Sequence, residues 1–133
     1  MDTAIITNAS PVEKLIVDYL EQKQRSLYHH KKRTDAEKEY NKLLTISGGE
    51  GKNFSVSEAE RIYKAYQEML LNEEQSKLAE EKYNESYGKL QELGRILFYG
   101  NITAEITMAP VNGNGPVTKF VTVSFPNGEV VVA

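Results

Sequence analysis

Apolar and polar positions follow a helical period over the first part of the chain. Residues Ser10 to Glu13 read Ser-Pro-Val-Glu, in which the serine can cap free amides and the glutamate completes a capping box. Pro11 suits the first helical position, and neither glycine nor proline occurs again before Gly48. Apolar side chains recur three or four residues apart along this stretch. The pattern predicts one helix over residues 11–45, about 50 Å long.

A second helix is predicted after a glycine-rich break. Residues 47–53 contain three glycines in four positions, which favours the end of a helix. Two overlapping capping boxes follow, Ser55 with Glu58 and Ser57 with Glu60, and apolar positions continue at helical spacing. We therefore expect a second helix over residues 58–98. Because two helices of similar length joined by a short loop fold back on each other, we expect an antiparallel helical hairpin, coiled-coil-like, over residues 10–99.

Beyond the second helix the hydrophobic period changes to two, the period of a half-buried strand. Runs of this kind occupy residues 102–108 and 117–125, and a short run follows at 130–132 after an Asn-Gly hairpin signal. The pattern predicts a C-terminal antiparallel β-meander over residues 100–133. Residues 1–9 also have strand-forming composition, so we expect an N-terminal strand or arm that can join the meander. The expected fold class is α+β.

The composition excludes several kinds of protein. The chain has 133 residues, of which 40% are hydrophobic and 26% are charged, as in one small folded domain. No run approaches the roughly 18 apolar residues of a membrane-spanning helix. The N-terminus has no signal-peptide pattern, so we expect a location in the cytoplasm or in a particle assembled there. The absence of cysteine excludes disulfides and zinc–thiolate sites, and we expect no cofactor or metal.

The net charge of −3 is unevenly distributed. Residues 21–52 carry eight basic and five acidic side chains, whereas residues 53–99 carry six basic and nine acidic ones. If residue 46 lies opposite residue 57 in the hairpin, residues 29–33 face the acidic stretch at 73–81. The basic cluster consists of His29, His30, Lys31, Lys32 and Arg33. We interpret it as one of two complementary helix faces. The alternative is a patch that contacts the phosphates of a nucleic acid. This alternative is less favoured, because consecutive residues of a helix point in all directions around it and do not form one patch.

Catalytic motifs are not evident in the sequence. Gly-Gly-Glu-Gly-Lys at 48–52 suggests a phosphate loop. The motif GxxxxGK[ST], however, would need glycine at position 46, which is Ile46, and serine or threonine at position 53, which is Asn53. No HExxH, GxSxG or dinucleotide fingerprint occurs. The eight tyrosines favour amphipathic core filler over a nucleobase platform, because no basic stripe surrounds them. We expect a protein that is not an enzyme.

Neither half of the predicted fold buries enough surface by itself, which favours packing against another chain. The middle of the hairpin has few apolar residues, and residues 100–133 carry only three charged side chains in strands whose edges invite pairing. The sequence therefore predicts a structural or assembly protein that acts through protein–protein contacts in a homo-oligomer or larger particle, such as a phage virion. The interface candidates are Phe120, Val121, Val123 and Phe125. We expect Val121, Val123 and Phe125 on one buried face and Phe120 on the opposite face, as the intersubunit contact.

Two other classes of function remain as alternatives. The first is a holdase-like chaperone or adaptor, whose helical arms would grip other proteins through tip residues Ile46, Phe54 and Val56. The second is a nucleic-acid-binding protein that uses residues 29–33, and its mark would be a steep loss of binding with salt.

Overall fold

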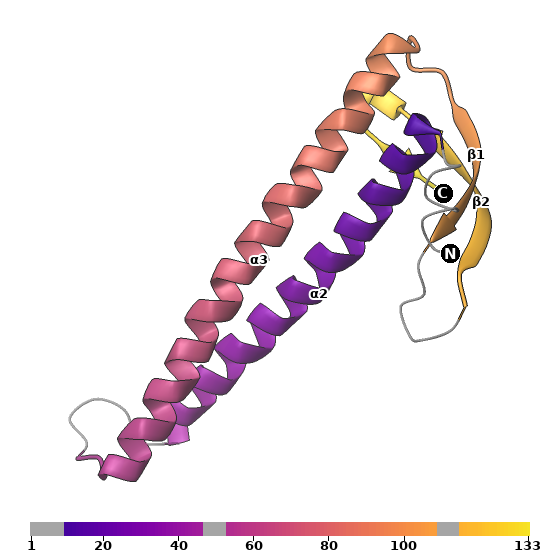
Figure 1. Ribbon diagram of the computed structural model, residues 1–133. Helices are drawn as coiled ribbons and strands as arrows, with labels where there is room; N and C mark the ends of the chain where they lie inside the picture. Colours follow the sequence, from indigo (N-terminus) through magenta and orange to yellow (C-terminus); the bar gives the residue numbers. More distant parts are fainter. Residues whose placement is uncertain (1–9, 47–52, 109–114) are drawn as a thin grey trace. The chain divides into compact units, whose positions relative to one another are not determined.

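Two long helices and a small sheet make up the computed structural model in Figure 1, which describes residues 10–46, 53–108 and 115–133. Helices α2 (Pro11–Ile46) and α3 (Val56–Ile96) pack against each other and precede a three-stranded antiparallel sheet. The predicted α+β class, helical hairpin and meander are confirmed. The predicted strand at residues 1–9 and nearly all of the glycine-rich tip lie outside the described residues.

Helix α2 begins at its predicted capping box, and α3 begins at the first of its two predicted boxes, two residues before the expected start at residue 58. The backbone N–H of Glu13 donates to Ser10 Oγ at 3.1 Å, and the N–H of Ser10 donates to Glu13 Oε1 at 3.2 Å. Ser55 and Glu58 exchange the same pair of hydrogen bonds at 3.1 and 3.2 Å. Each box satisfies amides that no helical carbonyl can reach, which fixes where each helix starts.

The sheet contains strands β1 (Ile102–Met108), β2 (Val117–Ser124) and β3 (Val131–Val132), in that order. Strand β1 pairs antiparallel with all of β2 but its last residue, and β2 pairs antiparallel with β3 through its last two residues. Between β2 and β3 the chain reverses through a short 3₁₀ turn, Pro126–Gly128. The Asn-Gly pair therefore lies in a hairpin connection, as predicted, although that connection is longer than a two-residue turn.

The turn between β2 and β3 depends on its Asn-Gly pair. Asn127 has φ 56° and Gly128 has φ 78°, which places both in the left-handed region. Asparagine and glycine are the residues that adopt this region most readily. The short side chain and the missing Cβ thus explain why the reversal occurs at this pair.

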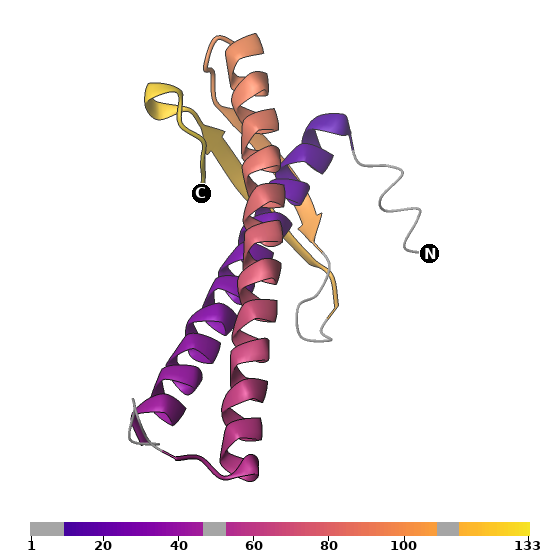
Figure 2. The ribbon, with the colours of Figure 1, turned by 90° about the vertical axis from the view of Figure 1, so that its left-hand side faces the viewer.

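The chain forms two compact units, which we describe separately. The sheet unit comprises residues up to Lys23 and from Lys82 onward, and the helical unit comprises Gln24–Glu81. In the sheet unit, one face of β1 and β2 packs against the adjoining helix segments (Figure 2). The core of this unit consists of Ile16, Tyr19, Leu90, Ile106, Met108, Val121, Val123, Phe125 and Val130. The unit boundary crosses both helices because their large buried apolar side chains lie within the sheet unit.

Candidate interaction surfaces

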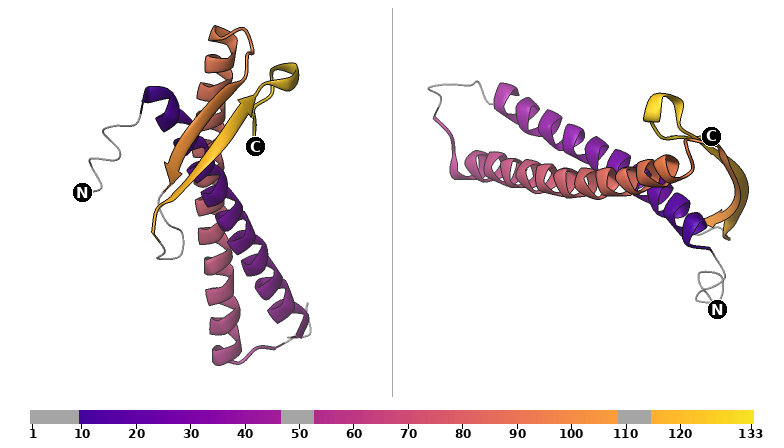
Figure 3. Two further views of the ribbon diagram at one scale, coloured as in Figure 1. Left: turned by 90° about the vertical axis from the view of Figure 1, so that its right-hand side faces the viewer. Right: turned by 90° about the horizontal axis from the view of Figure 1, so that it is seen from above.

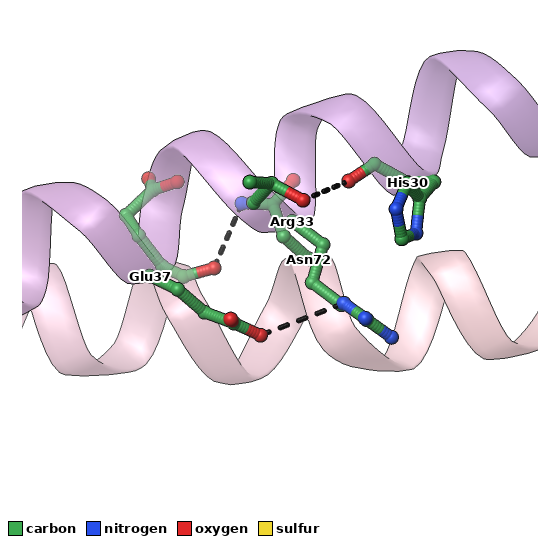
Figure 4. Close-up of polar contacts among 6 residues, drawn as sticks. His30, Arg33, Glu37 and Asn72 are labelled. Atoms are coloured by element: carbon green, nitrogen blue, oxygen red, sulfur yellow. Dashed lines mark hydrogen bonds and ion pairs between the residues drawn. The ribbon is translucent and has the colours of Figure 1, made fainter.

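The helical unit buries polar side chains between its helices. On α3, Asn72 and Ser76 are buried, and the Asn72 amide donates to the Glu68 carbonyl at 2.8 Å. On α2, Arg33 Nε lies 3.5 Å from Glu37 Oε1, near Asn72 (Figure 4). The Nδ1 atom of His29 is buried without a hydrogen-bond partner among the described residues. Little hydrophobic burial therefore holds this stretch of the two helices together.

The basic cluster at residues 29–33 is divided between two environments. His29 and Arg33 are half-buried, whereas His30, Lys31 and Lys32 are exposed. Lys32 Nζ lies 5.3 Å from the centroid of the Tyr28 ring, a cation–π distance. The cluster does not form one continuous basic surface, and this division weakens the nucleic-acid interpretation.

The charges of the two helices do not pair across the hairpin as we expected. In the described part of the chain, the ion pairs are Arg33–Glu37, Lys89–Glu85 and Arg95–Glu92, each within one helix. Within the part of the chain that the structure describes, no ion pair joins residues 29–33 to residues 73–81. The reason is that Asn72, Ser76 and Ala79 are the buried residues of this α3 stretch, so Glu74, Glu80 and Glu81 remain exposed and Glu73 is only half-buried.

One face of the sheet carries no helix, as the left view of Figure 3 shows. Val121, Val123 and Phe125 fill the core of the sheet unit, so these interface candidates are not on the surface. Phe120 points to the opposite face and is 73% exposed. Its partner in the register is Glu105, and it lies among threonines. The side-chain pattern predicted from the period of two thus places one large aromatic residue on an otherwise hydroxyl-rich face.

The end of α3 has a Schellman motif whose left-handed position is occupied by phenylalanine. The N–H of Phe98 donates to the Arg95 carbonyl at 3.2 Å, and the N–H of Tyr99 donates to the Gly94 carbonyl at 2.7 Å. Phe98 has φ 52° and Tyr99 has φ 61°. Glycine normally occupies the first of these positions, because a Cβ in this conformation costs about 1–2 kcal/mol.

The same turn exposes a run of large apolar side chains. Phe98 is 91% exposed, and its neighbours Ile96, Leu97 and Tyr99 are exposed as well. We call residues 96–99 the apolar turn. The predicted helix over residues 58–98 contains the first three of these residues, so this exposed surface was not predicted. The available signal was the unbroken apolar run before Gly100, which does not fit a helix with one buried face.

A hollow of about 370 Å³ lies between α2 and α3 in the helical unit. It is lined by Tyr40, Leu44, Phe54, Ala59, Ile62, Tyr63 and Tyr66, and we call it the tyrosine groove. The rings of Tyr40 and Tyr66 are 5.4 Å apart across it. Among the predicted tip contacts, Phe54 lines the groove, while Ile46 and Val56 are exposed. The lining of the groove is mainly apolar, and the groove is wide open to solvent.

Other tyrosines have a structural role in the sheet unit. The Tyr19 ring lies 5.6 Å from Tyr83 and 6.2 Å from Tyr87, and the Tyr87 hydroxyl accepts a hydrogen bond from the Val130 N–H at 3.1 Å. Burial raises the pKa of Tyr19, and the hydrogen bond with Tyr83 raises it further. A neutral, packed phenol is core filler, as predicted for these residues, and no acid or nucleophile function follows from it.

Neither a metal site nor a membrane-spanning helix is found in the described residues, and comparisons with known proteins point to no further site. Within the described ranges, no three His, Asp or Glu side chains gather as metal ligands, and no helix is apolar over a length that would cross a membrane. The sequence matches no protein-family model, and comparisons with curated proteins and with solved structures find no significant similarity.

Proposed function

We propose that the chain is a non-enzymatic structural or assembly protein that acts through protein–protein contacts of its sheet unit. The observation that carries the proposal is Phe98. Its backbone conformation disfavours bulky residues, while its side chain is 91% exposed and contributes little packing to the fold. A strained, solvent-exposed aromatic residue is useful to a protein that buries it against a partner, because aromatic anchors dominate binding energy.

The outer face of the sheet supports the same proposal. Phe120 stands exposed at the middle of β2, and β1 leaves one edge unpaired among the described strands. Strand addition or packing of a second sheet would cover both features. We propose a homo-oligomer or a larger particle, of which a phage virion is an example, as the setting in which this happens.

Replacing Phe98 by glycine provides the direct test. We expect Phe98→Gly to raise the free energy of unfolding by about 1 kcal/mol, because the strain is relieved and almost no packing is lost. We also expect it to weaken association at least about tenfold, since an aromatic anchor is removed. Urea denaturation measures the first effect, and sedimentation velocity over a concentration series measures the second.

Asn127→Gly is the matched control for this test. Asn127 has the same left-handed conformation, with φ 56°, but presents no apolar side chain. Glycine there should leave association unchanged. Unchanged association in Phe98→Gly would refute the role of the apolar turn.

A charge on the outer sheet face should lower the fraction of chains in the oligomer. We expect Phe120→Lys to shift the population toward smaller species with nearly constant helical content, because a desolvated ammonium is costly in an interface. Light scattering measures the mass of the species, and far-UV circular dichroism measures the helical content. Leu78→Lys makes the same kind of change at an exposed residue of the helical unit and serves as the control. A wild-type chain that stays monomeric at high concentration would contradict the assembly function.

An adaptor or holdase-like function is the second candidate, because the helical unit also exposes large apolar residues. These are Leu27, Tyr28, Tyr63, Tyr66, Leu70, Leu71 and Leu78, together with the tip residues. Such a function predicts that the chain suppresses aggregation of an unfolded protein and that Phe98→Gly leaves the suppression intact. That pair of results would favour this candidate over assembly.

A further inference from the structure

Strand β1 forms one edge of the sheet and has no second neighbour among the described strands (Figure 3). Natural proteins guard such an edge with proline, lysine, a bulge or a very short strand. The sequence of β1, Ile-Thr-Ala-Glu-Ile-Thr-Met, contains neither proline nor lysine, and its register with β2 is continuous over all seven residues. The edge is therefore a long row of backbone donors and acceptors that another strand can extend.

Hydrogen bonds on the other side of β2 show which backbone groups of β1 face the open edge. The Thr122 N–H donates to the Ala133 carbonyl at 2.9 Å, and the Ala133 N–H donates to the Thr122 carbonyl at 3.0 Å. Along an antiparallel strand, successive residues turn their N–H and C=O groups to opposite sides. Val121, the neighbour of Thr122, therefore bonds to its register partner on β1, which is Ala104.

The same alternation continues along β1. Because Ala104 bonds to β2, the N–H and C=O groups of Thr103, Glu105 and Thr107 face the open edge. Among the described residues, no backbone hydrogen bond to a turn or loop involves these three residues. The edge thus offers donors and acceptors at every second residue, which is the spacing that a further antiparallel strand requires.

The core beneath the sheet is also incomplete along part of this edge. Ile102 and Ala104 are only half-buried, whereas their register partners on β2, Val123 and Val121, are 0% and 4% exposed. Ile106, farther along β1, is 1% exposed. A strand that completes the core must therefore cover residues 102–104 and carry apolar side chains on its inner face.

We propose that the strand covering this edge is β1 of a second copy of the chain, antiparallel about a twofold axis at Ala104. The inference rests on the proposed assembly function and specifies its contact. Thr103 lies opposite Glu105 of the second copy, so the carboxylate gains a hydroxyl donor, and Ile102 lies opposite Ile106 of the second copy. The groups that face the edge then join in roughly four backbone hydrogen bonds. A twofold contact uses the same edge of both copies, so the product is a closed dimer with one continuous sheet.

The side-chain pattern of β1 selects this register over its neighbours. A shift by one residue would set groups that face the edge against groups that bond to β2, and would turn apolar side chains outward. An axis at Glu105 would place two carboxylates directly opposite each other, which destabilises a strand pair. An axis at Ile106 would leave Ile102 uncovered, and an axis at Thr103 would pair fewer residues of the two strands. At Ala104 a small side chain meets its own copy, where opposite side chains lie closest.

Amide hydrogen exchange tests the contact directly in the full wild-type chain. The N–H groups of Thr103 and Glu105 should exchange freely in dilute protein and become protected at least about tenfold at high concentration. The Ile106 N–H is the internal control, because it bonds to Lys119 on β2 and should be protected at every concentration.

Two outcomes of the exchange experiment overturn the proposal. Protection of Thr103 and Glu105 that does not change with concentration would mean that another part of the same chain, such as residues 1–9, covers the edge. Free exchange of both amides in a chain that assembles would show that assembly uses other contacts. In that case the edge pairing is wrong, while the proposed function stands.

Charges at position 103 test the register. The background is the full chain with Phe98→Gly and Phe120→Thr, which removes the two aromatic contacts of the proposed function without adding charge. Thr103→Lys should tighten the dimer about fivefold and Thr103→Glu should weaken it about fivefold by sedimentation equilibrium, because this position faces Glu105 of the second copy. Thr122→Lys and Thr122→Glu are the matched controls, since Thr122 is the register partner of Thr103 on the same face but lies one strand farther from the edge. Each should change the dissociation constant less than about twofold.

The results separate this proposal from the proposed function. Tighter association with lysine cannot come from a folding defect, so opposite responses to lysine and glutamate at Thr103 support the register. Equal effects at Thr103 and Thr122, or responses of the same sign, overturn it. A background chain that is monomeric at all accessible concentrations overturns edge pairing, even where the wild-type chain assembles through Phe98 and Phe120. A wild-type chain that is monomeric as well contradicts both proposals.

Discussion

Leu90→Ala is expected to lower the free energy of unfolding by about 3–4 kcal/mol. Leu90 is fully buried in the core of the sheet unit, where it belongs to the same cluster as Ile16, Ile106 and Val123. Removing its branched end loses transfer free energy and leaves a cavity that the sheet and helices can only partly fill. Urea denaturation followed by circular dichroism at 222 nm measures the loss.

The control is the same substitution on the same helix at an exposed position. Leu78 is 51% exposed, so Leu78→Ala should change the free energy of unfolding by no more than about 0.5 kcal/mol. Both variants gain the same small helix propensity, so the difference between their changes in the free energy of unfolding measures the packing of Leu90. Similar losses in the two variants would show that Leu90 is not in a tightly packed core.

Gly94→Ala is expected to destabilise the sheet unit by about 2 kcal/mol, although alanine is the better helix former. A Cβ at Gly94 would lie 2.6 Å from Cδ1 and 2.7 Å from Cε1 of the Phe125 ring. That ring is buried in the core and has little space into which to move. The overlap therefore outweighs the helix-propensity gain, and thermal denaturation should show a lower Tm.

Gly88 offers the opposite result in the same helix. A Cβ there would meet nothing within 4 Å, so Gly88→Ala should stabilise the protein by about 0.5–1 kcal/mol. The sequence shows both glycines as equal interruptions of α3. If both variants shift Tm in the same direction, the close approach of Phe125 to the helix is wrong.

Much of the fold was predictable because its signals are local. Ser–Glu capping boxes predicted the start of α2 and placed the start of α3 to within two residues, and the period of two predicted β1 and β2. The inward face of β2, with Val121 and Val123, followed from the same alternation. Each of these features depends on residues a few positions apart, so a single sequence contains the information.

The interaction surfaces were less predictable because they depend on contacts between distant segments. Ala59, Ile62, Tyr66 and Met69 recur at one helical spacing, yet in the structure Ile62 and Met69 are half-buried whereas Ala59 and Tyr66 are exposed. Likewise, the left-handed conformation of Phe98 follows from how α3 must end before β1 begins, and phenylalanine gives no local signal for it. Charge pairing across the hairpin failed as an expectation because it assumed a register without knowing which α3 residues are buried.

The polar stretch between α2 and α3 has a thermodynamic consequence for anything that binds beside it. Asn72, Ser76 and the half-buried Arg33 contribute little to keeping the helices together, so separation of the helices in the helical unit costs less than opening the sheet core. The tyrosine groove needs both helices in place, since its walls come from each. A molecule that occupies the groove therefore binds only the paired form and shifts the equilibrium toward it. Helix pairing and groove occupancy would then be linked, and the concentration of such a molecule would set how firmly this part of the chain is folded.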